Sequence, residues 1–168
     1  MIIEKIAGNI ASLATGNRKV DFLQLEWYEM TKRIQRKHTQ DGLEIAIKFL
    51  KEGQRLQHGD ILYIDDEKVV VVDILPSDAI VVTPRSLLEM GSVCYEIGNK
   101  HLPVFIQNDQ VLIPFEEPIF RWLAASGYDT VKAHTRLTNL LNANVQPHSH
   151  GGSSSLFSKI LGMAAKER

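Results

Sequence analysis

The chain has 168 residues, enough for one ordinary domain or two small ones, and its 44% hydrophobic and 23% charged residues are typical of a globular protein. Nineteen basic residues against twenty acidic ones leave a net charge of −1, which excludes a global attraction to nucleic acid or anionic lipid. The single cysteine excludes an internal disulfide, and no apolar run approaches a membrane span or a signal peptide, so we expect a cytoplasmic protein with no membrane partner.

Residues 1–75 predict an all-β domain. Short alternating apolar runs, which suit half-buried strands, stand between turns rich in glycine and aspartate. The expected strands cover residues 19–23, 43–49, 61–64 and 68–72. Several strands at this spacing, with no convincing helix, indicate a small barrel or sandwich, which we expect to be the partner- or peptide-binding part of the chain.

Residues 76–141 predict a second domain of the α+β class. The expected elements are a strand at 80–82, a helix at 87–97, a hairpin at 104–106 and 111–113, a helix from Glu117-Pro118, and a strand at 128–135. Ser86 is a favourable N-cap for the first helix, and Gly98-Asn99 is expected to end it. The order βαββαβ is that of a ferredoxin-like fold.

Residues 142–168 predict a tail. Its first part, 142–155, consists largely of Asn, Pro, His, Gly and Ser and is expected to be flexible. Its last part, 156–168, is amphipathic but near the length limit for an isolated helix in water, so we expect it to dock on a partner or to fray.

No pattern in the sequence indicates an enzyme. A Gly-rich phosphate loop, Gly-x-Ser-x-Gly, His-Glu-x-x-His and a cysteine pair with metal spacing are all missing. The acid pair Asp65-Asp66 fits a turn, and Glu116-Glu117 fits a helix start, where negative charge is favourable.

Histidine offers the candidate metal ligands. His148 and His150 are two residues apart, so in extended backbone both imidazoles can address one ion, although low-complexity drift explains the pair equally well. His101 follows the end of the first expected helix, where a lone histidine is more often a capping or surface residue. Near a two-fold axis, however, His101 meets its own copy, and the two rings with one or both tails give four to six ligands.

A basic run precedes the second expected strand. It contains Lys32, Arg33, Arg36 and Lys37 and closes with His38. These cations are candidates for binding an acidic partner or phosphate, and a solvated edge strand protected by charge is the alternative.

Several segments together resemble the UreE family of urease accessory metallochaperones. Residues 97–103, which read Ile-Gly-Asn-Lys-His-Leu-Pro, are similar to the family's Leu-Gly-Asn-Arg-His signature. Residues 32–44, residues 56–62 and Asp65-Asp66 follow in family order, so that the resemblance covers about residues 20–140. Lys100 stands where the family commonly has Arg, and the histidine content of the tail is sparse.

The resemblance implies a nickel carrier rather than an enzyme. It implies a head-to-head homodimer formed by the second domain, with His101 of each subunit binding Ni²⁺ and with His148 and His150 as auxiliary ligands. His134 is a further possible ligand, although a histidine in a strand is commonly structural. The implied partners are the GTPase UreG and the urease activation complex, with no nucleic acid among them.

Two other functions stay open at this point. The basic strand is compatible with an RNA- or protein-binding adaptor, whose binding would be sensitive to salt. A general zinc or copper buffer is the other possibility, because Zn²⁺ or Cu²⁺ can substitute for Ni²⁺ at an imidazole site.

Overall fold

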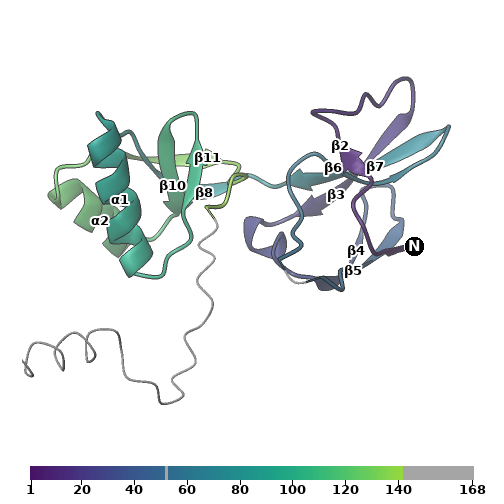
Figure 1. The fold of residues 1–168 in the computed structure, drawn as a ribbon, viewed down its shortest axis with the longest axis horizontal. Coiled ribbons are helices and arrows are strands. Elements are labelled where there is room, and N and C mark those ends of the chain that lie inside the picture. Colours follow the sequence, from purple (N-terminus) through teal and green to yellow (C-terminus); the bar gives the residue numbers. More distant parts are fainter. Residues whose placement is uncertain (52, 142–168) are drawn as a thin grey trace, which may run out of the picture.

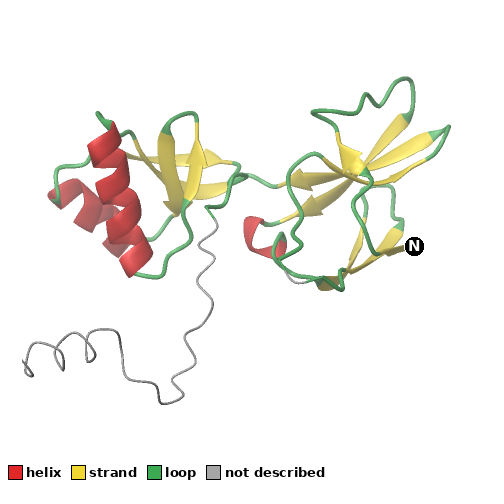
Figure 2. Cartoon of the chain, viewed as in Figure 1, coloured by secondary structure: helices red, strands yellow, loops and turns green. Residues whose placement is uncertain are grey.

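The computed structural model describes residues 1–51 and 53–141. The chain forms an N-terminal β domain followed by a C-terminal domain of four strands and two helices, as Figures 1 and 2 show. The predicted tail, with His148, His150 and the amphipathic segment 156–168, lies outside the described residues. None of the helices within the described ranges is long and apolar enough to cross a membrane.

The N-terminal domain is a sandwich of two sheets. Its strands are β1 Ile2–Ile3, β2 Gly8–Asn9, β3 Lys19–Leu25, β4 Ile34–His38, β5 Glu44–Lys48, β6 Asp60–Ile64 and β7 Lys68–Ile74. One sheet has the order β1-β5-β4 and the other β2-β6-β7-β3. Alternating residues such as Leu23, Leu25, Ile45 and Ile47 meet in the core between the sheets, which confirms the predicted all-β class.

A short 3-10 helix in this domain, η1 (Trp27–Glu29), was not predicted. Three helical residues are too few to produce the 3.6-residue periodicity by which a helix is found in a sequence. The helix is held locally because the Glu29 carboxylate accepts the backbone N–H of Glu26 at 3.2 Å. It follows β3 directly and brings Trp27 to the boundary with the second domain.

The C-terminal domain has the predicted ferredoxin-like order. Its elements are β8 Ser77–Val82, α1 Leu87–Asn99, β9 Phe105–Gln107, β10 Gln110–Pro114, α2 Glu117–Ala125 and β11 Thr130–Thr135. The sheet order is β11-β8-β10-β9, and every neighbouring pair is antiparallel. Both helices cover the face of this sheet that points away from the N-terminal domain (Figure 1). Ile80 and Val82 pack there with Val93 and Ile97 of α1 and Leu123 of α2.

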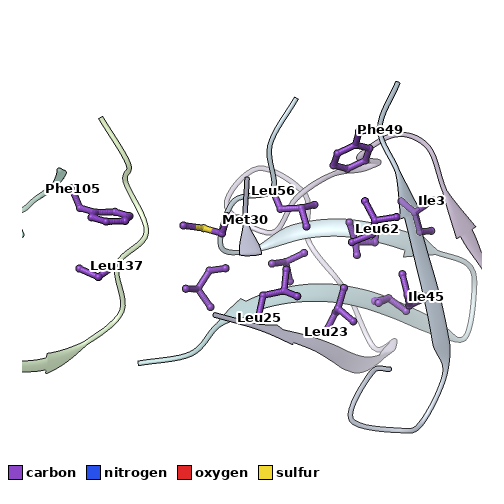
Figure 3. Packing of buried hydrophobic residues seen from close by; sticks show 14 of the residues in the cluster. Ile3, Leu23, Leu25, Met30, Ile45, Phe49, Leu56, Leu62, Phe105 and Leu137 are labelled. Carbon is purple, nitrogen blue, oxygen red and sulfur yellow. The ribbon is translucent and has the colours of Figure 1, made fainter. Parts of the chain in front are cut away.

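The other face of this sheet packs toward the N-terminal domain. Phe105 belongs to the same buried cluster as Leu25 and Met30, and Trp27 meets the Phe105 ring edge-on with centroids 5.8 Å apart. In Figure 3, Met30 projects from the N-terminal domain toward Phe105 and Leu137. The two domains therefore share one hydrophobic cluster.

An ion pair accompanies this apolar contact. The Arg136 guanidinium, just after β11, lies 3.3 Å from the carboxylate of Asp73 in β7. The Asp73 side chain is only 14% exposed, so the pair lies in a partly desolvated position where it favours one domain orientation.

We predict that Phe105→Ala lowers the free energy of unfolding by about 3–5 kcal/mol, because it empties a fully buried position between the domains. Val131→Ala, at a residue 52% exposed on β11, is the control and should cost less than about 1 kcal/mol. Urea unfolding followed by the fluorescence of Trp27 and Trp122, one in each domain, measures both. Equal losses for the two variants would contradict the shared cluster.

Candidate metal site and basic strand

His101 lies in the turn that ends α1. The helix ends at Asn99, within the predicted Gly98-Asn99 end, and Lys100 is its C-cap. His101 takes the left-handed conformation, with φ 57°. Its N–H donates to the Gly98 carbonyl at 2.9 Å, while the Leu102 N–H reaches the Ile97 carbonyl at 3.5 Å. These two bonds form a Schellman cap in which histidine occupies the position that is usually glycine.

The apolar contact across this cap explains why the helix runs past Gly98. Ile97 is fully buried, and Leu102 packs against the same cluster, which is the contact expected between the residues flanking a Schellman turn. The chain must therefore reverse between Ile97 and Leu102, which places the left-handed residue at His101. Such a conformation costs a non-glycine residue about 1–2 kcal/mol.

The cap presents the His101 imidazole at the surface. His101 is exposed, and the neighbouring Lys100 ammonium lies 4.4 Å from the ring centroid of Trp122 in α2. This cation–π contact draws the lysine toward α2. An exposed neutral imidazole on a fixed backbone can donate one nitrogen to a metal ion.

One face of α1 leading to His101 is exposed and apolar. Leu87, Leu88 and Tyr95 are 88%, 81% and 71% exposed. Leu88, Gly91, Tyr95 and Gly98 are spaced so that they follow one stripe of the helix.

His134, the further possible ligand, is engaged in a local ion-pair cluster. Its Nδ1 lies 3.0 Å from Asp78 Oδ1, and Lys132 Nζ lies 2.8 Å from Asp78 Oδ2. The hydrogen bonds from Lys132 and then His134 lower the pKa of Asp78. His134 and Asp78 are cross-strand partners of β11 and β8, so this contact has a structural role.

The described residues contain no group of three or more His, Cys, Asp or Glu placed to hold a metal ion together. Within them, the predicted ligands His101 and His134 are both exposed, and His134 is tied to Asp78. The other two predicted ligands, His148 and His150, belong to residues 142–168 and have no described position.

The basic run leads into β4, which contains Arg36 and Lys37 and is the edge of its sheet, and the cations of the run are largely paired. Lys37 points inward, and its Nζ lies 2.6 Å from a carboxylate oxygen of the buried Glu29. Lys32 lies 3.5 Å from the same carboxylate, and Arg36 lies 3.2 Å from Glu44. Arg33 is exposed. An inward-pointing lysine on an edge strand discourages strand addition, as the charge-protected alternative predicts.

The Glu29 carboxylate was not foreseen as the partner of these lysines. Its burial alone would raise its pKa, but the hydrogen bonds from Lys37 and from the Glu26 N–H, with the charges of Lys37 and Lys32, outweigh burial and lower the pKa. The ionised carboxylate thus contributes stability above the pKa of the unfolded chain, and this contribution is lost as the pH falls through the lower folded pKa.

At the α1 cap, we predict that His101→Gly is about 1 kcal/mol more stable than His101→Ala, because glycine adopts the left-handed conformation without steric penalty. His101→Gly should be at least as stable as the wild type. Thermal or urea unfolding of the three proteins measures the order. An alanine variant as stable as the glycine variant would show that the turn is not left-handed.

On β4, we predict that Lys37→Met destabilises the protein by about 1–3 kcal/mol at neutral pH, because the buried Glu29 carboxylate loses its nearest cation. Arg36→Met, which removes an exposed ion pair at the adjacent position of β4, should cost less than about 1 kcal/mol.

The pH provides a second check on Lys37→Met. The difference in free energy of unfolding between this variant and the wild type should shrink as the pH falls through the lowered pKa of Glu29, where the carboxylate becomes protonated. Urea unfolding at several pH values measures this. A deficit that is constant from neutral to acidic pH would rule out the Lys37–Glu29 pair as its source.

Comparison with known proteins matches each of the two domains to a described protein family. Residues 3–75 match the family described as UreE urease accessory protein, N-terminal domain, and residues 77–155 match the family described as UreE urease accessory protein, C-terminal domain. The chain is 66% identical to the urease accessory protein UreE of Flavobacterium johnsoniae over 164 residues, which cover 98% of this chain and 99% of that protein.

More distant relatives carry the same name. The UreE proteins of Haemophilus influenzae and Acetivibrio thermocellus are 46% and 39% identical over 147 and 153 residues. These alignments cover 85% and 91% of this chain and 80% and 99% of the relatives. The protein therefore belongs to the UreE family of urease accessory proteins, and it is an accessory protein rather than an enzyme.

Proposed function

We propose that the protein binds Ni²⁺ as a homodimer, through His101 of both protomers, and delivers the ion for assembly of the urease metal centre in the cytoplasm. The observation that carries this proposal is the exposed His101 imidazole at the end of the exposed apolar face of α1. Membership of the urease accessory family supports the recipient.

A two-fold dimer would account for both the exposed His101 imidazole and the exposed apolar face of α1. One imidazole supplies one donor, whereas Ni²⁺ in proteins takes several, so a carrier site built on His101 needs donors from a second chain. A two-fold contact repeats the same patch on both subunits. Pairing of the α1 faces would bury Leu88 and Tyr95 and bring both copies of His101 toward one axis.

Additional donors would come from His148 and His150 of each tail. Ligands contributed by separate arms give an avidity that falls when one arm is withdrawn, which suits a carrier that must release its cargo. The receiving partners are the GTPase UreG and, through it, the urease activation complex. The GTP chemistry belongs to that partner.

The structure favours this function over the adaptor built on the basic strand. Lys32 and Lys37 share the carboxylate of Glu29, and Arg36 pairs with Glu44, so two of the four positive charges of the basic run are balanced locally and fewer remain for an RNA backbone. Zn²⁺ and Cu²⁺ remain compatible with an imidazole site, because imidazole accepts all three ions.

Nickel titration of the full-length dimer tests the proposal. We predict that the wild type binds about one Ni²⁺ per dimer with high affinity and that His101→Asn loses this binding. Asparagine suits the variant because it tolerates the left-handed conformation but has no imidazole. Binding should also weaken below about pH 6, because the imidazoles must be neutral to coordinate the ion.

His134→Asn is the matched control. It removes an exposed histidine of the same domain that is paired with Asp78, and it should leave the nickel stoichiometry unchanged. Undiminished nickel binding by His101→Asn, or an affinity that stays flat from about pH 5 to pH 8, would contradict the proposal.

A further inference from the structure

The outward face of the sheet β1-β5-β4 carries exposed aliphatic side chains. Ile2 is in register with Ala46, and Ile34 is in register with Lys48, so these side chains share one face. Ile2 and Ile34 are 69% and 73% exposed, and Leu50, two residues beyond Lys48, is 71% exposed. The inward face is buried at Ile45, Ile47 and Phe49 (Figure 3 shows Ile45 and Phe49 in the core).

A groove of about 1100 Å³ adjoins this face. Ile3 of β1 and Leu62 and Tyr63 of β6 line it, so it lies between the two sheets of the domain. Ile2 and Leu50 line the groove as well. The outward face and the groove are thus one continuous surface, which we call the β1 surface. In the described part of the chain β1 pairs only with β5, so its second edge is open to another strand.

Among the residues that the structure describes, cations outnumber anions around the β1 surface. Lys5 and Lys51 line the groove and Lys48 stands on the outward face, while Glu4 is the acidic residue in the described part of the lining. On the outward face Arg36 and Glu44 neutralise each other. The positive charges of these lysines at the rim of the β1 surface would select a partner that carries carboxylates.

We propose that the β1 surface binds an extended segment of the GTPase partner, in which apolar side chains are flanked by carboxylates. The identity of the partner rests on the proposed function. The open edge of β1 fits strand addition, the aliphatic side chains fit apolar anchors, and the lysines fit the carboxylates. In this proposal the partner contacts the exposed aliphatic side chains of the sheet rather than the paired cations Arg36 and Lys37.

Other occupants fit the β1 surface less well. Bases of nucleic acid would need an aromatic platform, but Tyr63 is engaged: its hydroxyl donates to Asp65 at 2.8 Å and Lys68 lies over its ring. The chain's own segment 156–168 carries Lys159, Lys166 and Arg168 against the single acid Glu167. Its net positive charge opposes the lysines of the β1 surface.

Binding of the purified GTPase to full-length, nickel-loaded protein tests the inference. We expect Ile34→Ser/Leu50→Ser to weaken binding about tenfold or more in calorimetry, because two apolar anchors are removed. Nickel stoichiometry and thermal unfolding should stay at the wild-type values. The matched control, Val131→Ser/Leu141→Ser, removes two aliphatic residues about half exposed outside the β1 surface and should leave the affinity unchanged.

Five outcomes would overturn the inference. Three concern the variants: wild-type affinity in Ile34→Ser/Leu50→Ser, an equal loss of affinity in the control, and a change of the oligomeric state of Ile34→Ser/Leu50→Ser in sedimentation. The other two are binding of a synthetic 156–168 peptide at the β1 surface and a wild-type protein that does not bind the GTPase. The nickel titration of His101→Asn is independent of this measurement, so a failure of the metal site remains distinguishable.

Discussion

The structure depends on a four-stranded sheet, β11-β8-β10-β9, whose central strands β8 and β10 are buried on both faces. Alternation along β8 sends Ile80 and Val82 toward the helices and Ala79 and Val81 toward the N-terminal domain. The face of the sheet that packs against the helices holds α1 in place, and hence the turn at His101. The other side fixes the N-terminal domain through Phe105 and the Arg136–Asp73 pair. One layer thus sets the position of the proposed metal ligand relative to the β domain.

This arrangement separates the two surfaces to which we assign functions. In Figure 1 the helices lie at one end of the molecule and the N-terminus at the other, with the sheet between them. A partner held at the β1 surface would therefore leave the exposed face of α1 free to pair with a second copy. Nickel binding and partner binding can then occur together, which a carrier requires when it hands its ion to a receiver.

The sequence predicted most of the fold because its periodicities are strong. The alternation of residues 19–25 and the apolar run 68–74 are typical of strands, and the Ser86 cap predicted the start of α1. The end of α1 lies at Asn99 as predicted, but the sequence did not place the left-handed residue of the cap at His101, because the burial of Ile97 and Leu102 that determines it is tertiary. The pairing of Lys37 with Glu29 was missed for the same reason: Glu29 lies in a 3-10 turn that has no periodic signal.

The proposed metal site was less predictable than the fold, because the proposal takes its ligands from two chains. His101 was found from its sequence context, but its left-handed backbone and its neighbour's position come only from the structure. Lys100 places a positive charge beside a residue that we expect to bind a cation. Its contact with Trp122 at 4.4 Å leaves the charge in place but directs it over a ring whose face is negative. That arrangement reduces repulsion of an incoming ion while the cap still fixes the imidazole, so the same turn both presents the ligand and limits the electrostatic penalty for using it.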